Sequence, residues 1–190
     1  MFRLSALIVC LKLVNTECPV ETIERIRDFW GDEPPKNVLK SNVGMVTYVW
    51  MSGGFIKDKL NDDLYCFATN LDRDETSSTD ILMFTNRSAE EVSYFQTEDN
   101  GVITLYSHGE ADDTQYIISQ KNNVTAFWQC KVSNIDKYEP YVGISVKVSD
   151  LHSHTAEEAV IEAIDTLANL GFKTGTALPP CQREDFKIFL

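Results

Sequence analysis

The sequence predicts an all-β domain of short antiparallel strands, followed by a single C-terminal helix. Between residues 42 and 149, short runs of apolar and aromatic residues, several with the two-residue period of a strand, are separated by turn-forming clusters. From residue 155 onward the period changes to that of a helix. Because no helical pattern separates the strands, we expect successive strands to pair as neighbours, in either a barrel or a sandwich.

Eight candidate strands are expected, each bounded by residues that favour turns. They span residues 42–51, 64–71, 79–87, 91–97, 101–107, 114–120, 124–132 and 141–149. The last is the most regular, since Val142, Ile144 and Val146 alternate with small or polar residues and predict one buried face and one wet face. Asn100 and Gly101 both tolerate positive φ, which predicts a tight hairpin between two strands.

A short helical segment over residues 22–30 precedes the strands, and a longer helix follows them. Thr155 and Glu158 have the spacing of a capping box at the start of the longer helix. Gly171 stands where a helix C-cap is expected. We expect this helix to pack outside the sheet, because eight strands leave little room inside a small barrel. Its apolar stripe consists of Val160, Ile161, Ile164, Leu167, Ala168 and Leu170.

The 190 residues are enough for one domain with its own core, and the sequence shows no internal repeat or linker. The net charge of −12 argues against nucleic acid and against anionic membrane surfaces, since both attract clustered Lys and Arg. No stretch has the roughly 18 apolar residues that a transmembrane helix needs. We therefore expect no nucleic-acid partner and no transmembrane segment.

Residues 1–16 have the pattern of a secretory signal peptide. Arg3 supplies the positive start, and residues 4–11 form an apolar stretch too short to cross a bilayer. Cleavage after Thr16 would remove Cys10 and leave residues 17–190 as a single domain. We therefore expect a secreted, extracellular protein.

The cysteines that remain after cleavage are an even set, as in exported proteins with structural disulfides. They are Cys18, Cys66, Cys130 and Cys181. Four cysteines allow three connectivities, and the sequence alone does not choose among them. Asn86 and Asn123 begin glycan acceptor triplets, which fits export.

The residues offer no catalytic or metal-binding constellation. The acidic runs 72–75 and 110–113 lack the Gly and terminal Glu of a calcium loop, so both are interpreted as solvated hairpin ends. Ser52-Gly53-Gly54 is not a nucleophile elbow, which needs a Gly on each side of the Ser with one residue between. We expect no enzyme activity, no cofactor and no metal.

The order of elements resembles the lipocalin family, in particular insect bilin-binding and apolipoprotein D-like members. Eight strands, a preceding helical turn, a following helix and an extended tail at Pro179-Pro180-Cys181 carry the likeness, while Gly44-Met45-Val46 stands where the family has Gly-any-Trp. The resemblance implies an eight-stranded antiparallel up-and-down β-barrel with the C-terminal helix packed outside. It also implies the disulfides Cys18–Cys130 and Cys66–Cys181. A disulfide-linked sandwich is the alternative fold.

The resemblance implies a secreted carrier that binds a small hydrophobic molecule, such as a pigment or lipid, in its barrel. A ring-lined interior suits such a ligand. Strand alternation predicts that eight aromatic residues point inward and bind it: Tyr48, Trp50, Phe67, Phe84, Phe95, Tyr106, Tyr116 and Phe127. The alternative is a secreted protein-interaction module whose barrel is filled and whose loops contact a protein partner. An exported enzyme on the same barrel is a third hypothesis, and no residue supports it.

Overall fold

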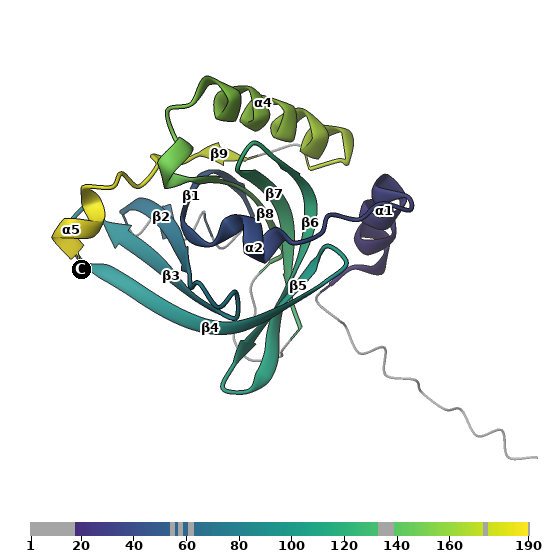
Figure 1. The fold of residues 1–190 in the computed structure, drawn as a ribbon, viewed down its shortest axis with the longest axis horizontal. Helices are drawn as coiled ribbons and strands as arrows, with labels where there is room; N and C mark the ends of the chain where they lie inside the picture. The colour runs from purple at the N-terminus through teal and green to yellow at the C-terminus, as the bar shows by residue number, and fades with distance from the viewer. Residues whose placement is uncertain are drawn as a thin grey trace, which may run out of the picture.

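The strands of the computed structural model form a closed antiparallel barrel, with helices around it (Figure 1). Residues 18–53, 56, 59–60, 63–132, 139–172 and 175–189 are described, so the predicted signal peptide lies outside them. The strands are β1 Gly44–Ser52, β2 Leu64–Leu71, β3 Ser77–Phe84, β4 Ala89–Asp99, β5 Val102–Ser107, β6 Glu110–Lys121, β7 Val124–Lys131 and β8 Tyr141–Lys147. Each pairs with the next, and β1 pairs with both β2 and β8, which closes the sheet. The up-and-down barrel is confirmed and the sandwich is wrong.

Turn geometry sets the strand boundaries that the residue pattern left approximate. β3 ends at Phe84 rather than at residue 87, because the N–H of Arg87 donates to the Phe84 carbonyl in a turn. The predicted hairpin between β4 and β5 is confirmed. Asn100 and Gly101 adopt φ values of 48° and 78°, the left-handed region that this turn requires.

The prediction that β8 has one wet face is wrong. Val142, Ile144 and Val146 do share one buried face, but it is the outer face of the barrel, covered by a helix. Gly143 and Ser145 between them are buried as well, because Gly143 faces the interior ring of Phe127 and Ser145 lines the inner space of the barrel. Small and polar residues on this strand therefore mark the inside of the barrel rather than solvent.

Helix α4, His154–Asn169, lies across the outside of β7 and β8, as predicted (Figure 1). Its buried face is made of Ala156, Ala159, Ala163 and Leu167, whereas Ile161, expected in the stripe, is 62% exposed. Small alanines allow the helix to approach the sheet closely. The capping box is not formed, since the N-cap is Ser153 and its side chain makes no capping hydrogen bond.

Two shorter helices pack beside α4 and at one end of the barrel. Helix α1, Val20–Trp30, packs against β6, where the Trp30 indole N–H donates to the Ile117 carbonyl at 2.8 Å. Helix α2, Val38–Asn42, buries its first two residues in the same hydrophobic cluster as the barrel interior. This helix therefore closes one end of the barrel.

A carboxylate on β4 holds helix α2 in place. The two Glu98 carboxylate oxygens accept the backbone N–H groups of Val38 and Leu39, each at 3.0 Å. Free N–H groups at a helix start need such partners, and an ionised acceptor gives the stronger bond.

Glu98→Gln is expected to lower the free energy of unfolding by about 1–2 kcal/mol, because the amide has one acceptor oxygen instead of two and no charge. Urea denaturation at pH 7 measures the change. Glu91→Gln is the matched control, since Glu91 is an exposed carboxylate on the same strand. Equal changes in the two variants would contradict a role for Glu98 in holding α2.

Two disulfides join the ends of the chain to the barrel. Cys18–Cys130 joins the segment before α1 to β7, and Cys66–Cys181 joins β2 to the C-terminal tail. The implied pairing is confirmed. Before reaching Cys181 the tail adds a short outer strand, β9 Thr176–Ala177, to β1. The chain then ends with helix α5, Asp185–Phe189; a 3₁₀ turn, Val148–Asp150, links β8 to α4.

Candidate ligand-binding site

The barrel interior is largely filled by side chains that leave two small chambers. Aromatic rings from β1, β2, β7 and β8 pack together in its centre: Tyr48 stacks on Phe67 at 4.1 Å between ring centroids, and Phe127 meets Tyr48 and Tyr141 edge-on. Asp80 on β3 lines both chambers, so they adjoin at its carboxylate.

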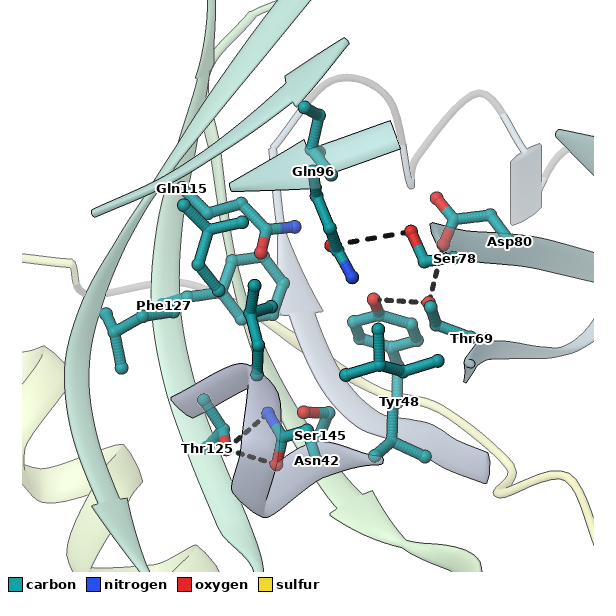
Figure 2. Close-up of a pocket in the computed structure, with 16 residues that line it drawn as sticks. Asn42, Tyr48, Thr69, Ser78, Asp80, Gln96, Gln115, Thr125, Phe127 and Ser145 are labelled. Carbon is teal, nitrogen blue, oxygen red and sulfur yellow. Dashed lines mark hydrogen bonds between the residues drawn. The ribbon is translucent and has the colours of Figure 1, made fainter. Parts of the chain in front are cut away.

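The inner chamber lies on the α2 side of Asp80 and has a volume of about 50 Å³. Half of its lining residues are polar, a larger share than the ring-lined interior expected from the sequence would have. Figure 2 shows these polar side chains around the Tyr48 and Phe127 rings. They are Asn42, Thr69, Ser78, Asp80, Gln96, Gln115, Thr125 and Ser145.

The second chamber, here called the mouth chamber, has a volume of about 140 Å³. It reaches solvent beside Glu90 and Val92, the latter 42% exposed. Its lining combines aromatic rings with charged groups. The lining residues are Lys59, Phe67, Asp80, Leu82, Glu90, Val92, Tyr94, Asp113, Gln129 and Tyr141.

A chain of hydrogen bonds leads from the stacked rings to Asp80. Thr69 donates its hydroxyl hydrogen to a carboxylate oxygen of Asp80 at 2.5 Å, and the Tyr48 hydroxyl lies 2.8 Å from the Thr69 oxygen (Figure 2). Because Thr69 has only one hydrogen to give, Tyr48 is the donor to Thr69 whenever Asp80 is ionised. This arrangement fixes the orientation of the carboxylate.

The environment of Asp80 disfavours its charged form. Burial raises the pKa of Asp80 to about 7, the hydrogen bond from Thr69 lowers it in part, and the charge of Asp113 raises it. Burial, with the charge of Asp80 as the next cause, also raises the pKa of both Tyr48 and Tyr94. Asp80 therefore titrates near neutral pH, and the two phenols stay protonated there.

Four of the eight aromatic residues predicted to point inward do lie in the interior cluster. They are Tyr48, Phe67, Phe84 and Phe127. Tyr48 and Phe127 line the inner chamber and Phe67 lines the mouth chamber, while Phe84 is packed in the same cluster.

The other four lie elsewhere, so their predicted inward placement is wrong. A β-bulge between Tyr48 and Trp50 turns Trp50 to the outer cluster beneath α4. Tyr116 lies in that outer cluster too, stacked on Trp30. Phe95 and Tyr106 pair across β4 and β5 on the outer face, with Phe95 52% exposed, because the inward positions there are Gln96 and Leu105.

Sequence reasoning missed the polar residues of the interior. Placing Phe84 inside already implied, by two-residue alternation along β3, that Asp80 and Leu82 also face inward. Asp113 was interpreted as part of a solvated hairpin end, yet it is only 3% exposed and lines the mouth chamber. An Asp at an inward position of a predicted strand, as alternation places Asp80, is the signal in the sequence that could have marked this site.

Comparisons with known proteins agree on the fold. No protein-family model matches the sequence, and no curated protein is similar to it in sequence. Among solved structures, lobster apocrustacyanin A1 superposes with a TM-score of 0.54 at 8% identity, over 86% of this chain and 88% of that one. Insecticyanin from the tobacco hornworm Manduca sexta gives 0.56 at 10% identity, over 78% and 86%.

A third similar structure is the siderocalin Ex-FABP, described as functioning through dual ligand specificities. It superposes with a TM-score of 0.53 at 12% identity, over 75% of this chain and 97% of that one. These proteins are lipocalins, so the chain has the lipocalin fold that its element order predicted. Among the helices that the structure describes, none has both the length and the apolar character needed to span a membrane.

Proposed function

We propose that the protein is a secreted carrier that binds one compact molecule inside its barrel. The observation that carries this proposal is the pair of adjoining chambers, lined by aromatic rings and by polar side chains from most of the strands. Such a mixture of apolar surface and a few oriented polar groups is typical of small-molecule sites. The lipocalin fold, shared with the proteins above, supports the same function.

Chamber volume indicates the size of the ligand. An apolar cavity of about 150 Å³ is known to accept one benzene ring, whereas drug-sized ligands need about 300–1,000 Å³. The mouth chamber, at about 140 Å³, therefore suits a molecule with a single ring. We accordingly propose a ligand smaller than the pigment or lipid that the sequence suggested.

Two further features support export. The disulfides Cys18–Cys130 and Cys66–Cys181 are of the kind that persists in oxidising compartments. Asn86 and Asn123 are both exposed, as glycan acceptors must be. Secretion and glycosylation remain predictions of the sequence that these features support.

Isothermal titration calorimetry with neutral, cationic and anionic single-ring compounds, and with long-chain fatty acids, tests the proposal. Trp30, Trp50 and Trp128 belong to the outer cluster, so calorimetry is a better reporter of interior binding than tryptophan fluorescence. We expect at least one single-ring compound to bind with one-to-one stoichiometry. Binding of fatty acids alone would contradict a compact ligand and return to the lipid carrier that the sequence suggested. Binding of nothing would contradict the carrier function and favour the filled-barrel, protein-binding alternative.

A variant that fills the mouth chamber locates the binding. Leu82→Trp places a larger side chain in that chamber and is expected to abolish binding, whereas Ile161→Trp on the exposed face of α4 should leave affinity unchanged. Circular dichroism confirms that both are folded. If Leu82→Trp does not fold, Val92→Trp at the chamber rim replaces it. Undiminished binding by a folded chamber variant would place the site elsewhere.

A further inference from the structure

The carboxylate between the two chambers has no positively charged partner among the residues that the structure describes. Asp80 has one hydrogen bond there, from Thr69 to one of its oxygens. The nearby lysines have carboxylates of their own: Lys59 pairs with Glu90 at 2.7 Å, and Lys131 pairs with Asp112 at 3.2 Å. A cation in either chamber could therefore approach Asp80 without displacing an existing ion pair.

The charges around Asp80 favour a cation over an anion or a neutral molecule. Asp113 lies across the mouth chamber, close enough that its negative charge raises the pKa of Asp80. The titratable and charged groups that line the mouth chamber with Asp80 are Lys59, Glu90, Tyr94, Asp113 and Tyr141. Tyr48 is linked to Asp80 through Thr69, and the Lys131–Asp112 ion pair adjoins Asp113, which is paired with Lys131 in the β6–β7 ladder. With Asp80 itself, the carboxylates in this set outnumber the lysines by four to two, so its net charge favours a cation over an anion.

Aromatic rings lie where the remainder of such a ligand would be placed. Phe67, Tyr94 and Tyr141 line the mouth chamber together with Asp80. An apolar ring can pack against their faces or edges, and their faces attract an adjacent positive charge. At about 140 Å³ the chamber has the size of one ring, and a short substituent on that ring would extend to Asp80, where the inner chamber adjoins.

Unused hydrogen-bonding capacity in the inner chamber shows that this side of Asp80 can hold a polar partner such as water. Gln96 and Ser145 are each only 5% exposed and line this chamber. In the part of the chain that is described, the Gln96 amide nitrogen and the Ser145 hydroxyl make no hydrogen bond; the Gln96 oxygen accepts one from Ser78. Buried polar groups of this kind normally have a partner, which a polar ligand or water would supply.

We infer that the ligand is a small organic cation, an aromatic ring with a short aminoalkyl chain, whose ammonium group binds Asp80. The ring lies against Phe67, Tyr94 and Tyr141 in the mouth chamber, and the ammonium group reaches the Asp80 carboxylate, where the two chambers adjoin. This inference rests on the proposed carrier function and names the chemical class of its ligand.

The test compares 2-phenylethylamine with 2-phenylethanol, a neutral compound of the same size, by calorimetry at pH 8. We expect the amine to bind more tightly by about tenfold or more, since a charge-assisted hydrogen bond replaces a neutral one. Equal affinities would overturn the cation inference and leave the carrier function standing. If neither these compounds nor any other in the single-ring panel binds, the carrier function fails as well.

Asp80→Asn isolates the role of the carboxylate. It keeps the side-chain shape and an acceptor for Thr69, and we expect it to weaken amine binding by about tenfold or more while leaving the affinity for the alcohol within about threefold. Asp72→Asn, which removes a charge at an exposed turn, should change neither affinity. Loss of both ligands in Asp80→Asn, or loss of neither, would overturn the assignment of the ammonium site.

Proton release gives a second readout. Because a cation favours the ionised form of Asp80, amine binding at pH 7 should release about half a proton per site, and almost none at pH 8.5. Titrations in two buffers of different ionisation enthalpy measure this number. Binding of the amine at pH 7 without proton release would contradict an ion pair with Asp80.

Discussion

Removing the Cys66–Cys181 disulfide is expected to cause a large loss of stability. The bond spans 115 residues, and in the chain-entropy model a loop of that length contributes about 4–5 kcal/mol by restricting the unfolded chain. For a domain of this size we expect Cys66→Ala with Cys181→Ala to lower the Tm by roughly 10–20 °C. Differential scanning calorimetry measures the shift.

The tail adds a structural reason for this effect. The Cys181 N–H donates to the buried Thr47 hydroxyl at 2.8 Å, and Leu178 packs in the interior cluster, so release of the tail exposes both. Met83→Leu, a substitution of similar volume beside the disulfide, is the control for packing alone and should change the Tm little. A double alanine variant that melts like Met83→Leu would contradict the stabilising role of the bond.

Replacing Asp80 by Asn is expected to stabilise the protein at alkaline pH, the opposite of the usual effect of an interior substitution. The folded protein raises the pKa of Asp80 from 3.8 to about 7, so it retains a proton that the unfolded chain has lost. The folded state therefore becomes less stable as the pH rises from about 4 to about 7, and above that the penalty is constant. Asn carries no charge and avoids the penalty.

At pH 8 we expect Asp80→Asn to raise the free energy of unfolding by about 1–3 kcal/mol, somewhat less than the full pKa shift implies because Asp80 is partly exposed. The gain should shrink toward zero near pH 4. Urea denaturation at several pH values gives the curve, with Asp72→Asn as a charge-matched control that should be flat. A gain that does not depend on pH, or a loss at pH 8, would show that Asp80 is not held in a disfavoured charged state.

If Asp80→Asn is more stable than the unmodified protein and yet binds the amine more weakly, misfolding cannot be the cause of the weaker binding. Residues that bind ligands are often unfavourable for the free protein, and the two outcomes expected for Asp80→Asn would place Asp80 among them. Its carboxylate destabilises the free barrel and is expected to bind the ammonium group of the ligand.

The fold could be predicted because its signals are local. The Asn100-Gly101 turn, the apolar alternation of β8 and the change of period at α4 each depend on a few neighbouring residues. The order of strands follows because short connections join antiparallel neighbours. The disulfide pairing could not be derived in this way, since it joins residues more than 100 positions apart, and it came from the resemblance to lipocalins.

The candidate site was harder to predict because a β-bulge interrupts the alternation of inward and outward side chains, and the sequence does not show where a bulge occurs. One bulge after Tyr48 reverses the direction of Trp50. On β4 the predicted set of inward residues was wrong by one position, so that Gln96 rather than Phe95 faces the interior. The expectation that large rings mark the inside also failed in part, since the outer face of this barrel is buried under α1 and α4. Aromatic residues such as Tyr116 and Trp128 fill that outer interface.

The polar residues inside the barrel were not predicted for a different reason. Asp and Gln in a strand are usually solvated, so the sequence favoured an outward direction for Asp113 and Gln96. Only the three-dimensional register shows that they share an interior with Asp80. The charge of the proposed ligand follows from Asp80 and Asp113, and of the aromatic set predicted from the sequence only Phe67 contacts its ring.

Native mass spectrometry of the protein recovered from secreting eukaryotic cells, followed by organic extraction, tests the central claim most directly. We expect one non-covalent adduct per chain with the mass of a single-ring compound, absent from the folded Leu82→Trp variant. An adduct with the mass of a lipid or tetrapyrrole would contradict a compact ligand in the mouth chamber. A bare protein that also takes up no single-ring compound would contradict the carrier function itself.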